Sequence, residues 1–180
     1  MYMRIVSIVL LLLFCGLVNA QTGGVTVSMA GIGDIKVGLK KEQLEKLTGR
    51  PIKLVNLLKK DEWQRDTVKF TYKDIPYEVV LDKDNVNETS QGVIVYEVRS
   101  SGAGLKTKSG IAIGDDKLKI VSTYNDYMMH IMPDWENNYT VKSKTRSIIM
   151  LFGDESSTVI TFYLTDGKVT SFSVGYSEGC

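Results

Sequence analysis

The sequence contains few of the residues that usually build metal sites and catalytic centres. Its 180 residues include one histidine and two cysteines, which leaves few ligands for zinc and little material for acid–base chemistry. Neither sign of charge is in excess, because the chain has 22 lysines and arginines and 21 aspartates and glutamates. Without a basic excess, binding to a nucleic acid backbone is not expected. We therefore predict a binding protein rather than an enzyme, with no metal, no cofactor and no nucleic acid partner.

The composition is that of a folded domain. Hydrophobic residues make up 43% of the chain and charged residues 24%, which excludes disordered and collagen-like proteins. Glycine-rich phosphate loops, nucleophile elbows and pairs of histidines at helical spacing are all missing from the sequence.

Residues 1–20 have the features of a secretory signal peptide. A charged start at Arg4 is followed by the apolar run 8–14 and by the small-residue ending Val18-Asn19-Ala20. The apolar run is short for a membrane-spanning helix. We predict cleavage after Ala20 and export to the periplasm or the medium.

An alternative for the same segment is lipidation at Cys15. Leu12-Leu13-Phe14-Cys15 is similar to a bacterial lipobox, although Phe14 stands where a small residue is usual. The mass of the intact mature protein distinguishes cleavage after Ala20 from lipidation, because a lipidated chain would start at Cys15 and carry added acyl mass. An anchored lipoprotein that helps to assemble outer-membrane proteins is the second functional hypothesis.

Removal of residues 1–20 would leave 160 residues with 21 charges of each sign and a single thiol, Cys180. An intrachain disulfide is then impossible, so stability must come from the core. Cys180 is expected to be exposed at the chain end. An intermolecular disulfide through this thiol is the alternative that the sequence leaves open.

Two segments of the chain show the same order of features. In each, an apolar residue precedes a glycine (Gly38, Gly114), and a helical apolar residue follows six positions later (Leu44, Ile120). Asp116 is a predicted N-cap for the second helix. Gly49 followed by Pro51 is predicted to end the first helix.

Strand patterns follow each predicted helix. The chain has strand-like runs at 68–72, 77–81, 93–98, 147–152, 158–164 and 169–176, and apolar residues alternate in the first, second and last of them. We predict an α+β fold of two tandem repeats, each a short helix followed by a three-stranded antiparallel meander, with the helices on one sheet face. The predicted repeats are residues 21–100 and 105–180, joined by a linker at 101–104.

The motif resembles that of a known superfamily. Val37-Gly38-Leu39, with Leu44, Leu47, Gly49 and Pro51 after it, is similar to the repeat of the β-lactamase-inhibitor-protein-like superfamily, which includes small outer-membrane barrel-assembly lipoproteins. The segment 110–115 resembles the second repeat of tandem members. The resemblance implies a scaffold whose sheet offers a surface to another protein.

Three residues are candidates for a binding surface, and one for catalysis. Trp63, Trp135 and Tyr127 are aromatic residues of the kind that anchor interfaces. His130 is the only histidine, and a hydrolase built around it is the third functional hypothesis; His130→Ala would then abolish turnover. The acidic segment 82–88 lacks the spacing of a calcium loop and is predicted to be a solvated hairpin loop.

The leading prediction is an exported, non-catalytic protein that binds another protein or a cell-envelope component through its sheet. The leader, the repeated pattern and the lack of a catalytic set are its grounds.

Overall fold

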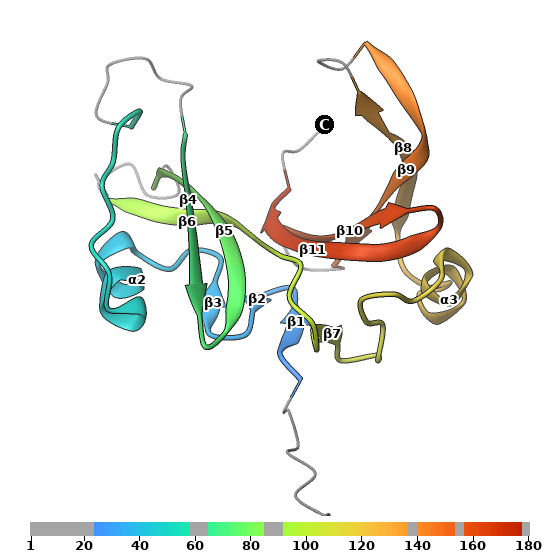
Figure 1. The fold of residues 1–180 in the computed structure, drawn as a ribbon, viewed down its shortest axis with the longest axis horizontal. Helices are drawn as coiled ribbons and strands as arrows, with labels where there is room; N and C mark the ends of the chain where they lie inside the picture. Colours follow the sequence, from blue (N-terminus) through green and yellow to red (C-terminus); the bar gives the residue numbers. More distant parts are fainter. Residues whose placement is uncertain (1–23, 58–64, 85–91, 137–139, 154–156, 178–180) are drawn as a thin grey trace, which may run out of the picture.

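The computed structural model describes residues 24–57, 65–84, 92–136, 140–153 and 157–177 (Figure 1). Strands account for 54% of this part and helices for 11%. The protein is therefore mainly β, and the predicted α+β fold of two tandem helix-and-meander repeats is wrong. The leader, Cys15 and Cys180 lie outside the described residues.

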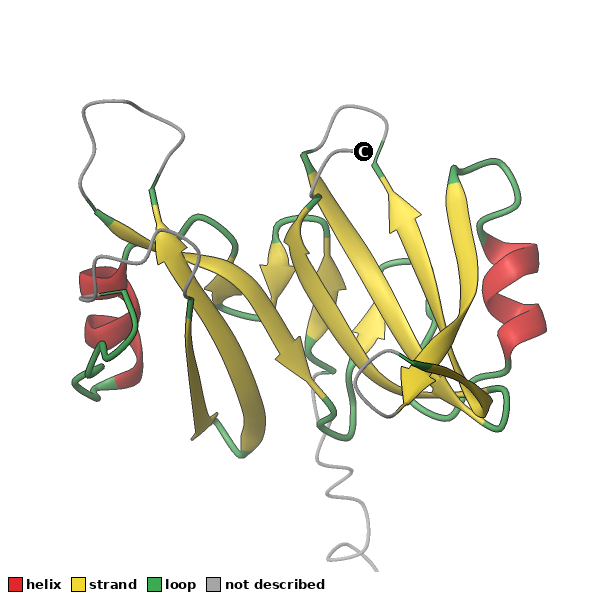
Figure 2. Ribbon diagram, turned by 90° about the horizontal axis from the view of Figure 1, so that it is seen from above, coloured by secondary structure: helices red, strands yellow, loops and turns green. Residues whose placement is uncertain are grey.

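Seven strands form one continuous antiparallel sheet, in the order β4-β5-β6-β11-β10-β9-β8 (Figure 2). They are β4 (Asp66–Tyr72), β5 (Ile75–Lys83), β6 (Val93–Ser100), β8 (Met129–Glu136), β9 (Val141–Phe152), β10 (Thr158–Thr165) and β11 (Lys168–Tyr176). Six of these strands were predicted from strand-like runs in the sequence, whereas β8 was not.

The pairing of β6 with β11 is the physical reason for the corrected fold. These strands pair from Glu97 opposite Gly175 to Ser100 opposite Phe172. Two separate meanders would each leave an edge of backbone amides and carbonyls without partners. Joining β6 to β11 satisfies one edge from each group of strands and produces a single sheet.

A second sheet consists of four very short strands in the order β3-β2-β1-β7. They are β1 (Thr26–Ser28), β2 (Gly31–Ile32), β3 (Ile35–Lys36) and β7 (Lys106–Thr107). The β1–β7 pair is parallel. Gly31 has a φ of 138°, and a Cβ there would lie 2.2 Å from the carbonyl oxygen of Ile35, so the tight β2–β3 connection requires glycine.

The two helices in the described part of the chain are short. The first is α2 (Lys41–Thr48), which ends at Gly49 in the left-handed conformation, as predicted. The second is α3 (Lys117–Thr123). None of the helices that the structure describes is long and apolar enough to cross a membrane.

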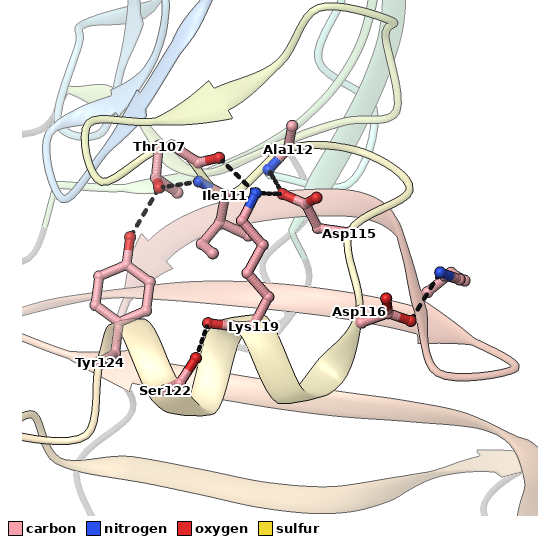
Figure 3. A network of polar contacts seen from close by, with 10 residues as sticks. Thr107, Ile111, Ala112, Asp115, Asp116, Lys119, Ser122 and Tyr124 are labelled. Atoms are coloured by element: carbon pink, nitrogen blue, oxygen red, sulfur yellow. Dashed lines mark hydrogen bonds and ion pairs between the residues drawn. The ribbon is translucent and has the colours of Figure 1, made fainter.

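The loop before α3 differs from the predicted capping (Figure 3). Asp116 occupies the N-cap position, but its side chain makes no capping hydrogen bond and pairs instead with Lys168, with 2.7 Å between Oδ1 and Nζ. Asp115 holds the loop: its Oδ2 accepts hydrogen bonds from the amide of Ala112 and from Nζ of Lys119, both at 2.7 Å. The charge of Lys168 therefore draws the predicted cap away from the helix amides.

One hydrophobic core lies between the two sheets and the helices. Fully buried side chains come from the large sheet (Val98, Phe162, Phe172), from β2 (Ile32) and from the helices (Leu44, Ile120). Residues of both predicted repeats contribute to it, and the division at 101–104 stays a prediction.

The large sheet has two distinct faces. We call the face that packs on the helices and the small sheet the inner face, and the opposite one the outer face. In Figure 1 the helices and the small sheet lie below β6, β11 and β10 of the large sheet, and Figure 2 shows the molecule from above.

Candidate functional site

Strand register defines a row of side chains across the outer face. Residues opposite one another on neighbouring strands point to the same face. Consecutive pairs give the row Lys69, Glu78, Arg99, Ser173, Thr161, Met150 and His130, from β4 to β8. The outer face is therefore charged on β4–β6, carries short polar side chains in the middle and is largely apolar on β9.

The apolar region is the part of the outer face formed by β8, β9 and the adjacent end of β10. It consists of Met132, Ile148, Met150, Phe152 and Val159, which the register places on the outer face. The first four are half-buried. An antiparallel sheet commonly has one face packed on the core and one polar, solvated face. Here β9 is apolar on both faces from Ile148 to Phe152, which indicates that the outer face can bind an apolar surface.

Short side chains on β11 separate this region from the charged one. The outer positions of β11 are Ser171, Ser173 and Gly175. Because they are short, long side chains on either side can meet above them: the guanidinium carbon of Arg99 lies 3.7 Å from the centre of the Tyr163 ring. A Cβ at Gly175 would lie 3.0 Å from the Glu97 side chain, so a larger residue there would have to displace that side chain.

A cleft opens where β6 and β11 separate. Their pairing ends at Ser100 opposite Phe172, and the space beyond has a volume of about 600 Å³. We call it the Arg99 cleft. Its lining includes Lys69, Phe70, Pro76, Glu78, Arg99 and Ser171.

Two of the three charged residues that line this cleft neutralise each other. Nζ of Lys69 lies 2.8 Å from Oε2 of Glu78. Arg99 donates a hydrogen bond from Nη2 to Oγ of Ser171 at 3.4 Å, and within the described part of the chain it forms no ion pair. Burial raises the pKa of the Tyr163 phenol, so this ring stays uncharged at neutral pH beneath the guanidinium.

The predicted aromatic anchors do not come together. Trp63 lies outside the described residues. Tyr127 precedes β8, is 47% exposed and packs edge-on against Tyr124, with 5.7 Å between ring centroids. Trp135, near the other end of β8, is 39% exposed, and Nζ of Lys142 lies 5.6 Å from its ring centre. Tyr127 therefore lies just before β8, and Trp135 lies within β8 near its other end.

His130 lies on the outer face of β8 and is exposed. Its ring packs against Phe152, with 4.8 Å between centroids, and Met150 is its partner across the strands. Neither neighbour can act as a nucleophile or orient an imidazole. Among the residues that the structure describes, His130 forms no hydrogen bond or ion pair, and the hydrolase hypothesis gains no geometric support.

The acidic segment 82–88 is described only up to Asp84. Asp82 accepts a hydrogen bond from Nε of Arg65 at 2.7 Å, while residues 85–91 lie outside the described part. Across the described ranges, no three histidine, cysteine, aspartate or glutamate side chains are grouped to hold a metal ion.

Sequence reasoning missed Arg99 and the apolar region. The run Ser147-Ile148-Ile149-Met150-Leu151-Phe152 carried a signal for the latter, because an apolar stretch without alternation is typical of a strand buried on both faces. No sequence pattern indicated Arg99. It lacks an acidic partner because Glu78 pairs with Lys69 instead, and that pairing is visible only in the structure.

Comparison of the chain with protein-family models, curated proteins and solved structures found no match. The superfamily resemblance therefore stays a prediction.

Proposed function

We propose that the protein is an exported, non-catalytic binding protein that binds another protein through the outer face of its seven-stranded sheet. The apolar region carries this proposal. Burial of apolar surface drives most protein association, and methionine and aromatic side chains are enriched at protein interfaces. Met132, Met150 and Phe152 provide such side chains on a sheet face that is not the core.

The layout of the outer face supports a protein partner over a small ligand alone. The apolar region occupies part of β8–β10, and Lys69, Glu78 and Arg99 lie on β4–β6, with the short side chains of β11 between them. Interfaces of proteins combine an apolar centre with polar groups that set orientation. Lys69, Glu78 and Arg99 would orient the partner that the apolar region binds.

Crosslinking in the native cell envelope tests the proposal. The tagged protein, expressed with its own leader, is crosslinked and purified, and bound proteins are identified by mass spectrometry. We expect a specific, saturable partner, and we expect Met150→Glu to reduce its capture by about tenfold or more, because the partner would have to desolvate a carboxylate.

The matched control is Thr67→Glu. Thr67 is exposed on the outer face of β4, opposite Val80, so the change adds the same charge to the same face outside the apolar region. Thermal unfolding of both variants verifies that the fold is intact. Equal capture by wild type and a folded Met150→Glu variant would contradict the proposal, as would the lack of any partner above a scrambled-surface control.

A further inference from the structure

The Arg99 cleft presents a positively charged group that has no acidic partner in the described structure. We propose that Arg99 binds the carboxylate of a ligand that carries an apolar group next to that carboxylate. The inference rests on the proposed binding function and specifies the chemistry recognised at the charged side of the outer face.

The hydrogen-bonding capacity of Arg99 is the first argument. A guanidinium has five N–H donors arranged to bind a carboxylate through two parallel hydrogen bonds. Only one donor is used within the described residues, in the 3.4 Å contact with Oγ of Ser171. Arg99 also lines the cleft of about 600 Å³, so a carboxylate can approach from that side.

The second argument is that Arg99 is held in place before any ligand binds. Its guanidinium carbon lies 3.7 Å from the centre of the Tyr163 ring, which fixes the plane of the fork. The Tyr163 hydroxyl is 3.4 Å from Oγ of Ser173, and burial keeps it protonated. A pre-positioned side chain loses less conformational freedom on binding.

Charge is the third argument, and it favours a ligand with a single negative charge. Glu78 lies directly across from Arg99 on β5, but its carboxylate is 2.8 Å from Nζ of Lys69. The charges of Lys69, Glu78 and Arg99 therefore sum to one positive charge in the cleft lining. Glu97, two positions before Arg99 on the same face, lies outside that lining and adds negative charge nearby, which further disfavours a dianion. A carboxylate balances that charge, whereas a phosphate dianion would leave a negative excess.

The apolar lining explains why the ligand needs an apolar group. Pro76 lines the cleft on the same face as Glu78 and Arg99, and so does the hydrocarbon stem of Lys69. The rings of Phe70 and Tyr77, which stack with centroids 5.9 Å apart, lie on the opposite, core face of the sheet. Ligand sites typically combine an apolar wall with a few polar groups that fix orientation. Arg99 would fix the carboxylate while Pro76 and the hydrocarbon stem of Lys69 contact the adjoining apolar group.

Side-chain NMR of the purified full protein tests the inference. Phenylacetate is titrated while the Nε–Hε signal of Arg99 is followed, and phenylacetamide serves as the neutral isostere. We expect a saturating shift with phenylacetate and binding weaker by about tenfold or more with phenylacetamide, because a charge-assisted hydrogen bond is lost. Non-saturating shifts, or equal affinity for acid and amide, would overturn the inference without any mutant.

Variants provide the second readout, followed through backbone amide signals around the cleft. Arg99→Gln is expected to abolish phenylacetate binding and Arg99→Lys to weaken it, because lysine keeps the charge but loses the fork. Arg146→Gln is the matched control: Arg146 lies on β9 and pairs with Asp134, with 3.4 Å between Nε and Oδ2. Undiminished binding by a folded Arg99→Gln variant would also overturn the inference.

A further comparison identifies the source of the carboxylate. The affinity of the peptide Ala-Ala-Phe with a free C-terminus is compared with that of phenylacetate. The same peptide with a C-terminal amide is the uncharged control. Tighter binding of the free peptide than of phenylacetate supports recognition of a partner's chain end, and equal binding supports a free small carboxylate. If carboxylate binding fails while Met150→Glu still disrupts partner capture, this inference is wrong and the proposed function stands.

Discussion

Neighbouring residues on β9 point to opposite faces of the large sheet, and both faces are apolar there. On the inner face Ile149 is fully buried and Leu151 is 2% exposed, because both belong to the hydrophobic core. On the outer face Ile148 and Met150 remain half-buried. The difference shows that apolar side chains alone do not make a core. The inner face stabilises the fold, while the outer face keeps apolar surface accessible for association.

The largest expected effect compares two isoleucines. Ile149→Ala should lower the free energy of unfolding by about 2–5 kcal/mol, because it leaves a cavity in the core. Ile148→Ala should lower it by about 1 kcal/mol, since its side chain is already partly in water. Urea denaturation followed by circular dichroism measures both. Equal losses would mean that the two faces are equally packed, contrary to the structure.

A carboxylate on each face extends the comparison to polar groups. Asp66, on the inner face, is 5% exposed, and its carboxylate accepts hydrogen bonds from the amides of Val55, Asn56 and Leu57 at 3.0–3.1 Å. Asp66→Asn should cost about 2 kcal/mol, because buried amides lose a charged acceptor. Glu78→Gln, which breaks only the exposed pair with Lys69, should cost less than about 1 kcal/mol. Denaturant midpoints of the two variants measure both losses of stability. A larger loss for Glu78→Gln than for Asp66→Asn would contradict the structure.

Two tyrosines give a finer test. The Tyr124 hydroxyl donates to Oγ1 of Thr107 at 2.8 Å in a buried setting, whereas the Tyr163 hydroxyl is 3.4 Å from Oγ of Ser173 on the outer face. Tyr124→Phe should lower stability by about 1 kcal/mol, and Tyr163→Phe should lower it by less. Thermal unfolding of both variants is the measurement, and a larger loss at Tyr163 would count against this difference between the faces.

The smallest expected effect concerns pH at the solvent-exposed loop before α3. The hydrogen bonds from Lys119 and then from the Ala112 amide lower the pKa of Asp115 below its ordinary value. A carboxyl whose pKa is lower in the folded state adds stability above its unfolded pKa and loses it as the pH falls through the folded value. Asp115→Asn should therefore flatten the decline in stability below about pH 4. Urea unfolding across that range measures the slope, with Asp126→Asn as the control; an unchanged slope would refute the assignment.

Local features of the fold were readable from the sequence, but the partners of the strands were not. Strand-like runs, some of them with alternating apolar residues, located six strands of the large sheet, and Gly49 marked the end of α2. The strand β8 was missed because Pro133 interrupts it, and proline is typical of edge strands. Strands of two or three residues, such as β2 and β1, are too short to show a period.

The arrangement of strands escaped prediction because it depends on distant pairing. Alternation shows which side chains share a face, but it does not show which strand lies alongside, so β6 and β11 could not be matched from sequence. The same holds for the candidate site. Arg99 could be placed on a strand face, but the stacking on Tyr163 requires β10 to lie beyond β11.

The position of β11 also determines when the sheet can be completed during synthesis. β11 is the last in sequence of the strands that the structure describes, yet it lies in the middle of the sheet between β6 and β10. A chain growing from its N-terminus has made the other six strands before Lys168–Tyr176 emerges, and until then β6 and β10 both present open edges. A stop codon within β11 would therefore leave two exposed strand edges at the centre of the molecule, which favours aggregation over a slightly shortened fold.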